Sequence, residues 1–175
     1  MRTREPGGTL GAECIRDILL NLGHSYSPII ETLLFTAARI DHMDELILPA
    51  LKAGKIVLCD RFIDSTRVYQ GIAGLLSQEF LLFLEKVAIG YRVPDLTFIF
   101  DLSVDLGLAR VSARKNRKNS DPFERANLFI QERRRKAFLR IAEEEPERCC
   151  VIDGSKSEKL IAAEIIKLFF MKIHV

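Results

Sequence analysis

The stretch IVLCDRFIDSTRVYQG, residues 56–71, decides the fold. It opens with a short continuous apolar run, residues 56–59, rich in β-branched side chains and followed at once by Asp60 and Arg61. This pattern predicts a strand buried on both faces, as in a parallel sheet covered by helices. Asp60 and Arg61 would then lie at the carboxyl end of a buried strand, which is where open α/β sheets bind ligands.

The polar residues of this stretch suit a nucleotide. The Asp60 carboxylate can hold a Mg²⁺-bound water, and the Arg61 guanidinium can fork onto phosphate oxygens. Hydroxyl and amide groups that can recognise a nucleobase edge follow at Ser65, Thr66, Tyr69 and Gln70. A structural alternative also fits, in which Asp60 and Arg61 form an ion pair and Ser65 caps a helix. These residues alone leave both interpretations open.

Strand and helix patterns alternate along the rest of the chain. A second buried strand is predicted at residues 96–102 and a third strand at residues 149–154. Residues 1–9 read as a loop that leads into a helix capped by Thr9. Helices are predicted at about residues 10–22, 25–53 (kinked near Pro49), 77–91, from 105, 124–144 and 155–171. This alternation predicts an α/β fold with a doubly wound parallel sheet.

Length and composition indicate one cytoplasmic domain of ordinary globular character. The chain has 175 residues and a net charge of +2, so it is not a polyanion binder as a whole. The cysteines Cys14, Cys59, Cys149 and Cys150 are expected to be reduced, buried thiols. Neither a membrane span nor a secretion signal is predicted.

Two further places could bind a ligand. Phe35 and Arg39 are four residues apart in a predicted helix, so they share a face that could stack on a base and reach its edge. The alternative is a core Phe35 with Arg39 paired to Asp41 or Asp44. Arg4, just before a Pro-Gly-Gly turn, is either a phosphate clamp or a solvated charge.

Basic residues are concentrated between residues 110 and 140. The concentration suits polyphosphate recognition, with nucleic-acid binding as a weaker alternative because the interleaved aromatic residues are few and fit core spacing. A solvated helix pair would also explain it.

Six collinear segments resemble the thymidylate kinases of bacteria. They are TREPGGT (3–9), LLFTAAR (33–39), DRFIDSTRVYQG (60–71), PDLTFIFDL (94–102), DPFE (121–124) and FLRIAEEEPERCCVIDG (138–154). The resemblance implies a P-loop nucleoside monophosphate kinase fold, a parallel sheet flanked by helices. It also implies Mg-ATP-dependent phosphorylation of dTMP to dTDP, most often by a homodimer.

The resemblance also implies residue roles. Phe35 would stack on thymine, while Arg39, Thr66 and Gln70, with Ser65 beside them, would recognise the base. Tyr69 would pack against the deoxyribose, and Arg4 and Arg61 would hold the dTMP phosphate. Asp60 would assist Mg²⁺ through its water shell. The mobile lid over ATP would span about residues 110–125, with Arg110, Arg114 and Arg117 at or beside it.

The sequence departs from the family pattern at two points. Pro122 stands where the lid motif usually has an arginine, and no G-x-x-x-x-G-K-[ST] phosphate-binding loop occurs in the 175 residues. In the family that loop, with the strand before it, precedes the TREPGG motif. We therefore expect the upstream reading frame to encode both, and the 175-residue chain alone to be poorly stable and inactive. A catalytically inactive nucleotide-binding relative, or a basic nucleic-acid-binding module, is the alternative.

Overall fold

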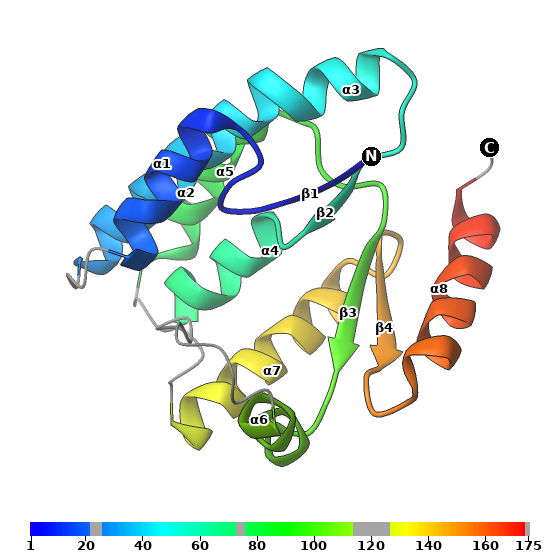
Figure 1. Ribbon diagram of the computed structural model, residues 1–175. Helices are drawn as coiled ribbons and strands as arrows, with labels where there is room; N and C mark the ends of the chain where they lie inside the picture. The colour runs from blue at the N-terminus through cyan, green and yellow to red at the C-terminus, as the bar shows by residue number, and fades with distance from the viewer. Residues whose placement is uncertain (22–25, 73–75, 114–126, 174–175) are drawn as a thin grey trace. The chain divides into compact units, whose positions relative to one another are not determined.

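The computed structural model describes residues 1–21, 26–72, 76–113 and 127–173 (Figure 1). Contacts between Cα atoms divide the chain into two compact units, Met1–Arg92 and Val93–Val175. Each unit contains a two-stranded parallel sheet, so the predicted parallel α/β architecture is confirmed.

The sheet of the first unit joins the start of the chain to the stretch that decides the fold. Strand β1 (Arg2–Arg4) pairs in parallel with β2 (Leu58–Asp60), with Thr3 opposite Cys59. The prediction that residues 1–9 form only a loop is therefore wrong. The three residues of β1 are all polar and carry little strand signal, and the backbone hydrogen bonds that make them a strand come from β2, more than fifty residues later.

Helices α1 (Leu10–Asn21) and α2 (Pro28–His42) pack side by side, and α2 also contacts α5 (Gln78–Ile89) (Figure 1). Ser27 and Ser77 cap α2 and α5, as their sequences indicate. The predicted long helix is divided into α2, a π-helical segment (Met43–Ile47) and α3 (Leu48–Lys52). This irregular segment lies just ahead of Pro49, because proline cannot donate the hydrogen bond that a regular helix needs and crowds the carbonyl four residues before it.

After β2 the chain forms the short helix α4 (Ile63–Thr66), which continues into a second π-helical segment (Arg67–Ile72). The core of this unit consists of apolar side chains from the first π-helical segment, α4 and α5: Met43, Ile47, Ile63, Ala88 and Ile89. Val57 packs against this core. It lies two residues before Cys59 of β2, so in an extended chain the two side chains point to the same face.

The second unit is built on β3 (Thr97–Asp101) and β4 (Cys149–Asp153), paired in parallel along their whole length. Helix α6 (Val104–Ala113) follows β3, and α7 (Leu128–Glu144) packs against both strands. The last helix, α8 (Glu158–Lys172), contacts β4. The core here combines Ile99 and Cys149 with Ala142 of α7.

The prediction of strands buried on both faces is wrong. Leu58 of β2 is 58% exposed and Phe100 of β3 is 55% exposed. Successive side chains of a strand point to opposite faces, and in each unit the described helices bury one face far better than the other. The expectation that every cysteine is buried also fails for Cys14, which lies on the exposed side of α1. No helix among the described residues is long and apolar enough to cross a membrane.

Candidate active site

The parallel register of β1 and β2 brings a predicted phosphate-binding residue and the predicted magnesium-assisting residue together. Arg4 lies directly opposite Asp60, and the Glu5 amide donates to the Asp60 carbonyl over 3.0 Å. Arg61 follows at the carboxyl end of β2, so two guanidinium groups and one carboxylate belong to the same sheet edge. Arg4 also donates to both carboxylate oxygens of Glu13, at 3.0 and 3.1 Å, at the protein surface. It is neither a buried core residue nor an isolated surface charge.

Arg61 has an unusual backbone. Its φ of +65° lies in the left-handed region that L-residues with a side chain seldom occupy. The Cys59 thiol donates to the Arg61 carbonyl at 3.1 Å, and burial raises the pKa of this thiol, which keeps its donor proton in place. The Arg61 guanidinium donates to the Tyr69 hydroxyl at 3.2 Å and lies 5.5 Å from the centre of its ring. The structure therefore brings two residues of the predicted dTMP site, Arg61 and Tyr69, together.

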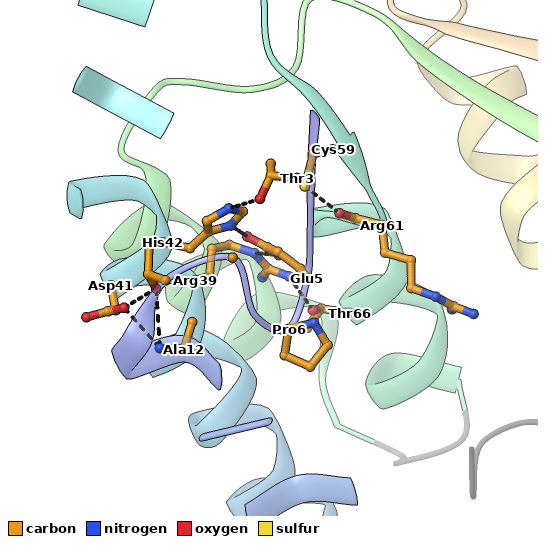
Figure 2. Close-up of polar contacts among 12 residues, drawn as sticks. Thr3, Glu5, Pro6, Ala12, Arg39, Asp41, His42, Cys59, Arg61 and Thr66 are labelled. Carbon is orange, nitrogen blue, oxygen red and sulfur yellow. Dashed lines mark hydrogen bonds and ion pairs between the residues drawn. The ribbon is translucent and has the colours of Figure 1, made fainter. Parts of the chain in front are cut away.

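Arg39 is almost fully buried and does not pair with Asp41 or Asp44. Its Nε donates to the Glu5 carboxylate at 2.8 Å, and its Nη2 donates to the Thr66 hydroxyl at 3.0 Å (Figure 2). Asp41 instead accepts from Thr9 and from the Ala12 amide, at the start of α1. Two predicted base-site residues, Arg39 and Thr66, thus meet directly.

The remaining predicted base-site residues lie on the same elements. Phe35 is half-buried on α2, one turn before Arg39. Gln70 is buried in the second π-helical segment and hydrogen-bonds the Glu31 carboxyl, whose pKa burial raises above its ordinary value. Ser65 is half-buried within α4 rather than at its N-cap position, which Phe62 occupies. The helix-capping alternative for Ser65 is therefore wrong.

Several residues around Arg39 were missed in the sequence. The ring of Phe62 lies 5.3 Å from the Arg39 guanidinium carbon, and Glu5, His42 and Thr3 form a hydrogen-bonded chain behind it. The three-residue spacing of Arg39 and His42 places them on one helix face, which was a usable signal. No local pattern, in contrast, links Glu5 to a helix more than thirty residues later.

In the second unit, Arg110 reaches the loop after β4. Its guanidinium donates to the carbonyl of Gly154 at 2.7 Å and to that of Ser155 at 3.3 Å. Arg110 therefore supports the loop at the carboxyl end of a parallel strand. The predicted lid residues Arg114 and Arg117, and Pro122, lie outside the described residues.

Comparison with known proteins shows the family of the chain. The family model described as thymidylate kinase matches residues 1–165. The thymidylate kinases of Bartonella henselae and Bartonella quintana are 49% and 50% identical to this chain, and each match covers 94% of this chain and 78% of the relative. The crystal structure of thymidylate kinase from Ehrlichia chaffeensis gives a TM-score of 0.76 at 33% identity, covering 97% of this chain and 79% of that one. The fold is thus that of a P-loop nucleoside monophosphate kinase, and the chain belongs to the thymidylate kinase family.

Proposed function

We propose that this protein is a dTMP kinase that transfers the γ-phosphoryl group of ATP to dTMP and gives dTDP. The observation that carries the proposal is the register of β1 and β2, which puts Arg4 opposite Asp60, the last residue of the strand that Arg61 follows. Phosphoryl transfer depends mostly on positioning and on neutralising charge, and this sheet edge supplies side chains for both.

The base would lie on α2. Phe35 supplies a ring for stacking on thymine, and Arg39 supplies N–H donors for its carbonyl edge. Thr66 already holds Arg39, and Gln70, with Ser65 nearby, completes recognition of the base. Tyr69, which contacts Arg61, would pack against the deoxyribose between base and phosphate.

The phosphate of dTMP would be held by Arg4 and Arg61. Arg4 would have to exchange its surface contact with Glu13 for the phosphate, an exchange that costs little because exposed ion pairs contribute roughly 0–1 kcal/mol. Arg61 is exposed and lies at the strand end, and its guanidinium would neutralise charge on the transferred group.

Asp60 fits an indirect magnesium contact. Its carboxylate is exposed at the carboxyl end of β2, and hard oxygen ligands and bound water are what Mg²⁺ prefers. When bound with ATP, Mg²⁺ would neutralise charge on the phosphates. In the second unit, Arg110 and the loop that it supports would contact ATP. The family resemblance implies the same role for Arg114 and Arg117, which lie outside the described residues.

A homodimer in the cytoplasm completes the proposal. Apolar side chains on the adjacent helices α2 and α5 are exposed, a feature of surfaces that bind another protein: Ile29, Ile30, Leu33, Leu82, Phe83 and Val87. All four cysteines are free, as expected in a reducing compartment. Sedimentation analysis should give a dimer that Phe83→Glu dissociates and that Phe129→Glu, on α7, leaves intact.

Nucleotide binding tests the proposed substrate without requiring turnover. Calorimetric titration should show that dTMP binds at least about tenfold more tightly than dCMP, because the donor-only Arg39 suits the thymine carbonyl and not the cytosine amino group. Arg39→Leu should remove this preference. Equal affinities of the unmodified protein for dTMP and dCMP would contradict the proposed function.

A further inference from the structure

A buried carboxylate lies at the centre of the cluster behind Arg39. Glu5 accepts from Arg39 Nε through one oxygen at 2.8 Å, and its other oxygen lies 3.2 Å from His42 Nδ1 (Figure 2). The side chains of Glu5, Arg39 and His42 are 5%, 4% and 0% exposed. Thr3 continues the chain, with its hydroxyl oxygen 2.7 Å from His42 Nε2.

One arrangement of protons satisfies this chain. If Nδ1 of a neutral His42 carries the hydrogen, it donates to Glu5, and Nε2 accepts from the Thr3 hydroxyl. The buried cluster then holds one carboxylate and one guanidinium, so its charges balance. Each atom of the chain has a partner, and Glu5 is fixed through both of its oxygens.

The backbone at Gly8 packs against the Thr3 end of this hydrogen-bonded chain of side chains. A Cβ on Gly8 would lie 2.5 Å from the Thr3 hydroxyl oxygen and 2.6 Å from His42 Nε2. Gly8 also has a φ of +94°, which favours glycine. The turn therefore packs directly on the Thr3–His42 hydrogen bond, which limits the ways in which His42 can move.

Two nitrogens of the Arg39 guanidinium, Nε and Nη2, are fixed by hydrogen bonds. Nε is fixed by Glu5, Nη2 by Thr66, and the Phe62 ring lies against the guanidinium carbon. Within the described part of the chain, Nη1 contacts no acceptor. A planar group fixed at two corners presents its third corner in one direction, which is what reading a base edge requires.

We propose that Glu5, supported by His42 and Thr3, is a positioning residue that sets the Arg39 guanidinium for recognition of the 4-carbonyl group of a pyrimidine. The inference rests on the proposed function, in which Arg39 reads the base. It adds that selectivity for thymine over cytosine depends on residues that do not touch the nucleotide. The competing explanation is that Glu5 serves only to neutralise a buried arginine.

The test compares base selectivity in Glu5→Gln and Asp41→Asn, with dTMP and dCMP as titrants. Glu5→Gln keeps the size of the side chain but removes its charge. The affinity for dTMP should therefore fall by about tenfold or more, which is the scale of one charge-assisted hydrogen bond. The affinity for dCMP should stay the same. Asp41→Asn alters a carboxylate on the same helix that does not contact Arg39, and its dTMP-to-dCMP ratio should equal that of the unmodified protein. A Glu5→Gln variant that binds both nucleotides as before, or loses both equally, would overturn the inference.

A second pair of variants decides the matter if Glu5→Gln does not fold. Thr3→Val removes only the hydroxyl, and Thr3→Ser restores it. Thr3→Val should lower the ratio of dTMP affinity to dCMP affinity by about twofold or more, which is the low end of the range for the loss of a neutral hydrogen bond. Thr3→Ser should leave this affinity ratio unchanged. Equal ratios in the two variants would overturn the inference. Failure of the proposed function is a different result, in which the unmodified protein already shows no preference for dTMP.

Discussion

At the scale of single residues, the carboxyl end of β2 combines residues of the candidate site with backbone strain. Arg61 keeps a left-handed conformation although its side chain makes this costly, at about 1–2 kcal/mol for an L-residue. Strained residues of this kind concentrate at functional sites because the surrounding structure must hold them in place. Here the β1–β2 pairing and the Cys59 thiol provide that support.

Arg61 offers a direct test of this strain. Arg61→Gly and Arg61→Ala both remove the guanidinium, but only alanine keeps a Cβ at positive φ. The free energy of unfolding of Arg61→Gly should exceed that of Arg61→Ala by about 0.5–1 kcal/mol in denaturant titrations, after allowance for the flexibility of glycine in the unfolded chain. The same pair at Lys136, exposed within α7, should show the opposite order. An alanine variant as stable as the glycine variant at residue 61 would show that no strain is present.

Phe35 can be tested against its alternative as a core residue. Phe35→Ala should weaken dTMP binding by about 1–3 kcal/mol, the range for a base stacked on an aromatic ring, and should leave ATP binding unchanged. Calorimetry gives both affinities, with Phe129→Ala on α7 as the control. An unchanged dTMP affinity would assign Phe35 to packing alone.

At the scale of elements, most helices and strands follow from local sequence signals. Serine caps start α2 and α5, and the hydrophobic runs of β3 and β4 are visible in the sequence. Two elements do not follow from local sequence signals. β1 is a strand only because β2 pairs with it, and the π-helical segment before Pro49 has no sequence pattern of its own.

One ion pair connects a strand to a helix and makes the second unit sensitive to pH. Arg135 of α7 donates to both oxygens of Asp101 at the end of β3, at 2.6 and 2.9 Å, and this hydrogen bonding lowers the pKa of Asp101. A carboxyl with a lowered pKa stabilises the folded state above its ordinary pKa of about 4, and the contribution is lost as the pH falls through the lowered value.

Asp101→Asn should therefore lower the melting temperature at pH 7, and this deficit should shrink as the pH falls through the lowered pKa of the wild-type Asp101 carboxyl. Thermal unfolding followed by circular dichroism measures the difference across this range. Asp95→Asn, in the exposed segment before β3, is the matched control and should shift the melting temperature little at either end of this pH range. A deficit in Asp101→Asn that is equally large at both ends of the pH range would show that the ion pair is not its cause.

At the scale of the whole molecule, the family could be predicted from the sequence, whereas the contacts that support the candidate site could not. Arg39, Thr66, Arg61 and Tyr69 were recognised from motifs, and the structure brings them into two contacting pairs. Glu5 could not be found in the same way, because it contacts Arg39 and His42 of α2 from the position after β1, and no local spacing records that contact. The one-sided burial of β2 and β3 was also missed, since continuous apolar runs do not reveal which face the helices cover.

The most direct test of the central claim is a crystal structure of the protein with dTMP bound. In that complex we expect thymine to stack on Phe35 with its 4-carbonyl oxygen within hydrogen-bond distance of Arg39. We expect the phosphate to contact Arg4 and Arg61, at the carboxyl ends of β1 and β2. We also expect Glu5 to keep its bond to Arg39 in that complex. Density for dTMP away from α2 and this sheet edge, or Arg39 turned from the base to another partner, would contradict the account.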